Sequence, residues 1–308
     1  MSPASGAAVM ATGIVSVDLA SDGYETLSRL ILGVGTAMWL GLGVLLVAQA
    51  LLDRPRVQRE AASPAALTGA AGTAVLGTRY AELGWRWAGA TLLVVAVVLW
   101  LVVLGPVLRH WETPTIGVSF VLTVATEALA VLAATLATSD HARWLVYAAL
   151  ALFALGLASY AFVLSRFDWR QLLVGHGDHW VGGGALAISA LAAGTIALAA
   201  QYLGIIASAP EVALVVIWAG AVVWLPALLA VEATHARLRY DVRRWATVFP
   251  LGMFASCSFV VGDAVGADWM RHFARVWSWV AFAVWLVVLA AAAFIQIGRC
   301  AGRSGPVE

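Results

Sequence analysis

Charged residues are scarce in this chain. They make up 11% of its 308 residues, whereas 62% of the residues are hydrophobic. An ordinary soluble domain carries about 25% charged residues, so this chain cannot cover a water-facing surface of its own size. The scarcity excludes a soluble enzyme, a nucleic-acid binder and a disordered scaffold. An outer-membrane barrel is excluded too, because its strands alternate in polarity over about ten residues, whereas the apolar runs here are long and continuous.

Lysine is absent, and only two cysteines are present. All 18 basic residues are arginine and the formal net charge is +1, so no overall field attracts a polyanion. The lack of lysine is typical of a GC-rich coding sequence and indicates a bacterial source. Cys257 and Cys300 are far apart, and His176 and His179 flank Asp178 with no further ligand nearby. We therefore predict no disulfide, no metal site and no cofactor.

Signals for cleavage and for catalysis are also missing. Residues 1–20 lack the basic start of a signal peptide and a convincing cleavage site. The chain contains no H-E-x-x-H, G-x-S-x-G or phosphate-loop motif. The sequence therefore predicts a protein that is not an enzyme and that has no catalytic residues.

Long apolar segments occupy most of the chain. A helix needs about 20 apolar residues to cross the hydrocarbon core, and ten such segments follow one another: 3–20, 26–52, 64–80, 84–108, 115–137, 142–165, 180–201, 210–233, 244–262 and 274–297. The sequence predicts an all-α polytopic membrane protein, with residues 1–308 forming a single transmembrane domain.

The arginines between these segments predict the orientation. With both termini on one side, that side carries twelve arginines and the other carries six, namely Arg29, Arg79, Arg86, Arg143, Arg271 and Arg275. The side with more arginine faces the cytoplasm. We therefore expect a multi-pass protein of the bacterial cytoplasmic membrane with both termini in the cytoplasm. For Arg79, we favour an ion pair with Glu82 or a headgroup anchor over a role in an anion vestibule.

An aromatic marker recurs in the even-numbered segments. Trp39, Trp100, Trp224 and Trp285 are joined by Phe162, and successive markers lie 61 or 62 residues apart. A fixed period indicates a repeated structural unit, although chance matching is the alternative in a chain with 15 tryptophans. We expect five helical hairpins of about 61 residues, arranged as a pseudo-fivefold ring around a central pore.

The odd-numbered segments are rich in Gly, Ala, Ser and Thr, whereas the even-numbered ones are rich in Val, Leu and Trp. The small residues recur at i, i+3 and i+4, so each set shares one helical face. Such a face allows membrane helices to pack closely, or it forms the wall of a narrow pore, and both uses remain open. The candidate pore-lining residues are Thr12, Gly13, Ser16, Thr73, Thr123, Thr126, Glu127, Ser189, Gly252 and Ser256.

Three short motifs carry a family resemblance. They resemble the first, seventh and ninth helices of the tellurite-resistance/C4-dicarboxylate transporter family, which includes slow anion channels: Met10-Ala11-Thr12-Gly13, His179-Trp180-Val181-Gly182-Gly183-Gly184 and Trp245-Ala246-Thr247-Val248-Phe249-Pro250. The resemblance implies ten helices in five hairpins around a pore, assembled as a homotrimer in the bilayer. It also implies a small anion as substrate: a dicarboxylate, halide, nitrate, sulfite or tellurite-related oxyanion.

The resemblance further implies a gate in the ninth helix. The pore-closing phenylalanine falls on Phe249, with Phe254 and Phe259 as alternatives. Pro250 follows it and cannot donate its backbone hydrogen bond, so we expect a kink there that turns nearby side chains toward the axis.

Glu127 departs from the expected pattern. It is an acidic residue well inside a predicted span, where a charge is costly and usually marks an ion or proton path. A carboxyl group in such surroundings favours its neutral form, which points to a proton-coupled carrier, whereas a neutral staple between helices is the structural alternative. A different class also remains open, a membrane scaffold or sensor whose vestigial pore conducts nothing.

Overall fold

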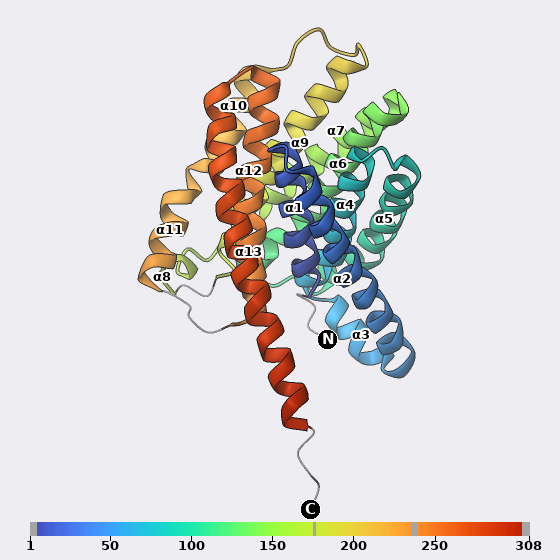
Figure 1. Ribbon diagram of the computed structural model, residues 1–308, viewed down its shortest axis with the longest axis vertical. Coiled ribbons are helices and arrows are strands. Elements are labelled where there is room, and N and C mark those ends of the chain that lie inside the picture. Colours follow the sequence, from blue (N-terminus) through green and yellow to red (C-terminus); the bar gives the residue numbers. More distant parts are fainter. Residues whose placement is uncertain (1–4, 175–176, 236–239, 304–308) are drawn as a thin grey trace, which may run out of the picture.

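The computed structural model describes residues 5–174, 177–235 and 240–303, and its elements are helices. Figure 1 shows them gathered in one bundle, from which the C-terminal end of α13 projects. His176 of the sequence analysis lies outside the described residues. The principal helices are α1 (Gly6–Ser21), α2 (Glu25–Leu52), α4 (Thr68–Glu82), α5 (Arg86–Arg109), α6 (Val121–Asp140), α7 (Arg143–Leu164), α9 (Trp180–Tyr202), α10 (Glu211–Val222), α11 (Trp224–Thr234), α12 (Trp245–Val265) and α13 (Asp268–Arg303).

Eight helical stretches in the described part of the chain are long and apolar enough to cross a membrane. The first and third predicted spans fold as shorter helices: α1 has 16 residues and α4 has 15. Two short helices were not predicted, α3 (Arg54–Ala61) and α8 (Gln171–Val174). The eighth predicted span is interrupted between α10 and α11. Pro226 explains the interruption, since its ring clashes with the carbonyl group of Val222.

The bundle has a buried inner set and an exposed outer set of helices. In the stretch that contains α6, 94% of the residues in its most apolar window are buried. In the corresponding window of α5, only 11% of the residues are buried. The inner set consists of α1, α4, α6, α9 and α12, which pack against one another in that order, and α12 packs back against α1. Each inner helix also packs against the outer helix that follows it in the chain. Apolar residues on all sides of the inner helices fit this burial.

Tryptophans of the outer helices donate hydrogen bonds to hydroxyl groups of inner helices. The indole of Trp39 donates to Thr73 Oγ1 at 2.8 Å, and that of Trp100 donates to Thr126 Oγ1 at 3.1 Å. Trp285 Nε1 donates to Thr12 Oγ1 at 3.0 Å. These bonds fix outer helices against α4, α6 and α1, and they satisfy polar groups that have no water available.

The other two markers lie differently. Trp224 Nε1 donates to the hydroxyl of Tyr160 on the outer helix α7 at 3.1 Å. Trp218, one and a half turns earlier, makes the bond to an inner helix instead, donating to Ser258 Oγ at 2.8 Å. Phe162 is 40% exposed, and its ring centroid lies 5.7 Å from that of Trp111 with the two rings tilted by 51°. Equivalent positions are therefore observed for three of the five markers.

Candidate functional site

A cavity of about 540 Å³ lies between the inner helices. Each of the five inner helices contributes residues from its C-terminal half, among them Val17 of α1, Thr78 of α4 and Val131 of α6. α9 and α12 contribute Thr195 and Val260 in the same way. The five helices therefore point the same way around the cavity, and their C-terminal ends surround its mouth.

The cavity ends on an apolar floor. The floor residues come one from each inner helix and are Ile14, Val75, Ala128, Ile188 and Met253. They are at most 6% exposed. By contrast, Ser21 and Tyr202 at the mouth are exposed. The cavity thus opens at one end of the bundle and is closed toward the middle by side chains without polar groups.

Most hydroxyl groups that were expected to line a pore face other helices instead. Thr12, Thr73 and Thr126 accept the tryptophan hydrogen bonds described above. Thr123 Oγ1 lies 3.0 Å from Ser159 Oγ of α7, and Ser16 Oγ donates to the carbonyl oxygen of Ser28 in α2 at 2.8 Å. Among the expected lining residues, only Ser256 lines this cavity.

The expected glycines serve close helix packing. A Cβ atom at Gly13 would lie 2.8 Å from Val75 Cγ1, so α1 and α4 can approach only because that atom is missing. A Cβ atom at Gly252 would lie 2.6 Å from Ile14 Cγ2, so α12 and α1 can likewise approach only because that atom is missing. At Gly13 and Gly252 the absence of a side chain therefore serves close packing, one of the two roles that the sequence left open.

Glu127 is fully buried at the meeting point of α6, α7 and α9. Ser189 Oγ donates a hydrogen bond to Glu127 Oε1 at 3.1 Å. Gly156 of α7 makes room for this carboxyl group, because a Cβ atom there would lie 2.5 Å from Glu127 Cδ. Its other oxygen, Oε2, has no hydrogen-bond partner among the described residues. Glu127 and Ser189 therefore join three helices and are not among the residues that line the cavity.

Asp18 is a second buried carboxyl group, and the sequence analysis missed it. Ser256 Oγ donates a hydrogen bond to Asp18 Oδ1, while Oδ2 has no partner in the described part of the chain. Since Ser256 lines the cavity, Asp18 lies directly behind the cavity wall, between α1 and α12. Its position three residues before the end of an apolar helix hid it, because an acidic residue near a helix end looks solvated in sequence.

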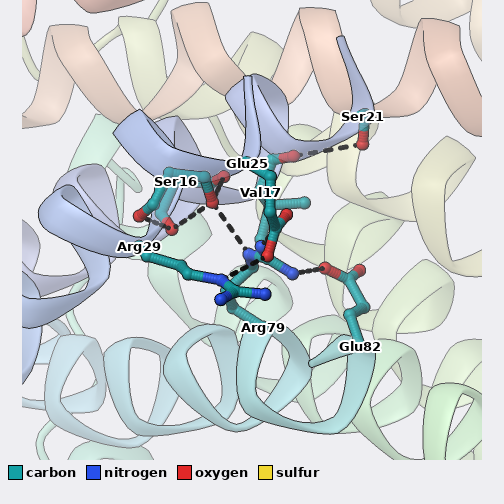
Figure 2. A network of polar contacts seen from close by, with 8 residues as sticks. Ser16, Val17, Ser21, Glu25, Arg29, Arg79 and Glu82 are labelled. Carbon is teal, nitrogen blue, oxygen red and sulfur yellow. Dashed lines mark hydrogen bonds and ion pairs between the residues drawn. The ribbon is translucent and has the colours of Figure 1, made fainter. Parts of the chain in front are cut away.

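A buried arginine lies next to Glu82, which lines the cavity. Figure 2 shows the polar contacts of this arginine. Arg79 of α4 is 2% exposed. Its Nη2 lies 2.6 Å from Glu25 Oε2, its Nη1 lies 3.6 Å from Glu82 Oε2, and its Nε donates to Ser28 Oγ at 2.9 Å. The expected ion pair with Glu82 is therefore present, and a second one with Glu25 accompanies it. Of these groups, only Glu82 lines the cavity.

Phe249 lies one helical turn before the cavity floor. On α12 the cavity-lining residues are Met253, Ser256 and Val260, and Phe249 precedes Met253 by four residues, so it shares their face. It is 2% exposed. Phe254 lies between α13 and α9 instead: its ring centroid is 6.4 Å from that of Trp277, and its Cζ would lie 3.2 Å from a Cβ atom on Gly183.

Pro250 packs against α9 within a continuous α12. A Cβ atom at Gly184 of α9 would lie 2.8 Å from Pro250 Cγ, so these helices meet closely beside Phe249. A kink at Pro250 stays a prediction.

Comparison with known proteins decides the family. A family model described as voltage-dependent anion channel matches residues 1–293. The chain belongs to the voltage-dependent anion channel family. It is also 32% identical over 138 residues to an uncharacterized membrane protein of Mycobacterium tuberculosis, found in strains CDC 1551/Oshkosh and ATCC 25618/H37Rv. That match covers 41% of this chain and 68% of the relative.

Membership in the voltage-dependent anion channel family confirms the resemblance seen in the three sequence motifs. The family consists of channels and transporters, and the bacterial membrane protein to which the chain is similar agrees with the apolar helices described here. The chain is therefore a multi-pass membrane protein whose family indicates anion transport. In this member of the voltage-dependent anion channel family, the candidate transport site is the cavity between the inner helices.

Proposed function

We propose that this chain transports small anions across the bacterial cytoplasmic membrane through the space enclosed by its five inner helices. One observation carries the proposal: in a member of an anion channel family, five helices pack in a closed cycle around a cavity of about 540 Å³. Dicarboxylate, halide, nitrate, sulfite and tellurite-related oxyanions are the substrate candidates. The test is uptake of each anion by proteoliposomes, with and without a pH gradient, against protein-free liposomes.

The architecture proposed with this function has ten spans, with α1 and α4 counted as the two shorter ones. Each inner helix and the outer helix after it form a hairpin, and five hairpins form a pseudo-fivefold ring. Both termini face the cytoplasm, and the mouth of the cavity faces the opposite side, because the C-terminal ends of the inner helices surround it. Three such chains assemble as a homotrimer. Labelling of single cysteines placed before α1 and at the start of α10 tests the orientation.

Phe249 is the proposed gate. It continues the cavity-lining face of α12 beyond the apolar floor, and a large ring among small side chains closes a pore by steric block and dewetting. Phe249→Ala should raise anion flux without changing which anions pass. Phe254→Ala is the matched control, because that ring lies between α13 and α9. If both substitutions raise the flux equally, Phe249 is not the gate. The same conclusion follows if Phe249→Ala folds and leaves the flux unchanged.

The apolar floor favours one further candidate, a membrane scaffold or sensor with a closed, vestigial pore. The floor residues Ile14, Ile188 and Met253 are almost completely buried. A scaffold would show no flux above protein-free liposomes even with Phe249→Ala, whereas the transport proposal requires flux in that variant.

A further inference from the structure

A second cavity, of about 770 Å³, lies at the other end of the bundle. Its walls come from α3, from the loop after α5, and from two short 3₁₀ turns, η2 (Pro64–Leu67) and η3 (Gly117–Phe120). These turns lead directly into α4 and α6. The second cavity therefore lies where two inner helices begin, whereas the cavity between the inner helices opens where they end. Figure 1 shows α3 at the lower end of the bundle, toward the N-terminus.

The hydroxyl groups of the second cavity present hydrogen atoms. Ser63 Oγ accepts a hydrogen bond from the backbone N–H of Ala65 at 3.3 Å, and Ser119 Oγ accepts one from the backbone N–H of Ile116 at 3.2 Å. Neither hydroxyl hydrogen has an acceptor among the described residues, so each is available to a ligand.

The cavity between the inner helices has the opposite polarity. Its residues Thr78, Thr135 and Thr195 donate their hydroxyl hydrogens to carbonyl oxygens of their own helices. Their oxygen lone pairs are left for a ligand. The second cavity is therefore the one whose hydroxyl groups suit an oxyanion.

Two opposite charges in the second cavity are unpaired. Arg59 of α3 and Glu112 of the loop after α5 both line it, and both are exposed. Within the described part of the chain, no ion pair joins either of them to the other or to a third residue. The neighbouring Arg56 differs, because it pairs with Glu60 at 2.9 Å. A ligand that carries both signs of charge would match this lining.

Two further polar side chains of the lining fit such a ligand. The Nδ1 atom of His110 lies 2.9 Å from the carbonyl oxygen of Pro106, so this nitrogen donates and the Nε2 atom of the neutral ring accepts. The amide of Gln58, which is exposed, both donates and accepts. Neither side chain adds a fixed charge of one sign.

Exposed leucines place the second cavity at the edge of the apolar surface. Leu51 and Leu52, which are 76% and 87% exposed, directly precede α3. Leu108, which is 51% exposed, comes two residues before His110. These leucines end two of the stretches that are long and apolar enough to cross a membrane. Polar headgroups flank the hydrocarbon core of a bilayer, so the second cavity lies at their level.

We propose that the second cavity binds the headgroup of a phospholipid that carries a primary ammonium group, as phosphatidylethanolamine does. The phosphate group accepts hydrogen bonds from Arg59, Ser63 and Ser119, and the ammonium group donates to Glu112. The starts of α4 and α6 add partial positive charge near the phosphate group. The volume is sufficient for a phosphoethanolamine group.

This ligand would connect three parts of the bundle. Arg59 belongs to α3, Ser63 directly precedes η2 and α4, and Ser119 belongs to η3 directly before α6. The two turns η2 and η3 already contact each other. A bound headgroup would therefore hold the starts of two inner helices together, at a site separate from the proposed transport path.

The experiment measures lipid binding to the full chain in detergent by native mass spectrometry. It compares three phospholipids with the same acyl chains: phosphatidylethanolamine, phosphatidylcholine and phosphatidylglycerol. Phosphatidylethanolamine should bind at about tenfold lower concentration than the other two, because hydrogen bonds to charged groups are strong. The trimethylammonium group of phosphatidylcholine has no N–H to donate, and phosphatidylglycerol has no cationic group.

Arg59→Gln tests the phosphate contact. It should weaken phosphatidylethanolamine binding about tenfold or more, because it removes a charged donor. Arg54→Gln is the matched control, since Arg54 is also an exposed arginine of α3 without an ion pair among the described residues, but it does not line the second cavity. The control should leave binding unchanged.

Glu112→Gln tests the ammonium contact. It should abolish the preference for phosphatidylethanolamine over phosphatidylglycerol while binding of phosphate-containing lipids persists. Glu211→Gln, which removes an exposed carboxylate at the start of α10, should keep the preference. Both glutamates of this comparison are exposed, so neither substitution disturbs the interior of the bundle.

Several results would overturn the inference. Equal binding of the three lipids, or tighter binding of phosphatidylcholine or phosphatidylglycerol, contradicts the primary ammonium group. Equal losses in Arg59→Gln and Arg54→Gln contradict the assignment to the second cavity. Displacement of the lipid by an equimolar amount of free phosphoethanolamine would assign the site to that soluble compound and overturn the lipid as its source. None of these results bears on the transport proposal, because binding is measured without flux.

Discussion

Replacing Gly156 by alanine should destabilise the meeting point of α6, α7 and α9. The added Cβ atom would lie 2.5 Å from Cδ and 2.7 Å from Cγ of Glu127. Carbon atoms pack at about 3.5–4.0 Å, so the whole Glu127 side chain must move by about 1 Å. That movement breaks its 3.1 Å hydrogen bond from Ser189, in a site that is fully buried.

The magnitude follows from two opposing contributions. Overpacking a well-packed interior costs about 1–3 kcal/mol. Exchanging a helical glycine for alanine gains up to about 1 kcal/mol from helix propensity. Gly41→Ala in α2 isolates the second contribution, because nothing lies within 4 Å of a Cβ atom at that position. We therefore expect Gly156→Ala to be about 1–3 kcal/mol less stable than Gly41→Ala.

Reversible unfolding in detergent micelles, followed by tryptophan fluorescence, measures both free energies of unfolding. The same Gly156→Ala substitution in a Glu127→Ala background should cost far less, giving a coupling energy of about 1 kcal/mol or more. Equal stability of Gly156→Ala and Gly41→Ala would refute this account of the site. An undiminished cost in the Glu127→Ala background would refute it as well.

Three further predictions concern other contacts of the bundle. Trp39→Phe should lower the free energy of unfolding by about 0.6–1.7 kcal/mol, because it removes the hydrogen bond to an inner helix. Trp87→Phe is the control and should leave the free energy of unfolding unchanged, because Trp87 is 73% exposed. Arg79→Met should destabilise by about 1.5–3 kcal/mol, because it removes charged hydrogen bonds to Glu25 and Ser28, whereas Arg29→Met, in an exposed pair, should cost at most about 1 kcal/mol; thermal unfolding compares the two. Glu127→Gln should leave the pH profile of transport unchanged in flux assays, because Glu127 lies outside the cavity lining. Loss of the pH dependence in this variant would contradict the prediction and show that Glu127 takes part in transport.

The helical segments were predictable because membrane insertion imposes a length and a composition on each span. The predicted segment 180–201 corresponds to α9 (Trp180–Tyr202), and 142–165 corresponds to α7 (Arg143–Leu164). Errors occurred where hydropathy says little. The polar helix α3 (Arg54–Ala61) was missed because it has no apolar run. The start of α13 at Asp268 was predicted too late, at residue 274, because Asp268, Arg271 and His272 interrupt the apolar pattern of its first two turns.

The family could be recognised from local motifs, since a short run such as Met10-Ala11-Thr12-Gly13 is fixed by the close contacts of one helix. The match of residues 1–293 to the voltage-dependent anion channel family confirms that resemblance. The periodic tryptophans were only partly informative. Trp39, Trp100 and Trp285 bond to inner helices, whereas Trp224 bonds to an outer one and Trp218 takes its role.

The sequence by itself determined which segments are apolar enough to be helices in a membrane, and which of them are rich in small residues. It did not determine which face of an inner helix turns toward the cavity. Those helices are buried on all sides, so polarity does not distinguish a face that packs from a face that lines a space. Only the tertiary structure decided that Thr12 and Thr73 face outer helices, that Asp18 lies behind Ser256, and that the lining hydroxyls donate to their own backbone. The physical reason is that a hydroxyl group in an apolar helix must find a partner, and the partner is set by the rotation of the helix against its neighbours.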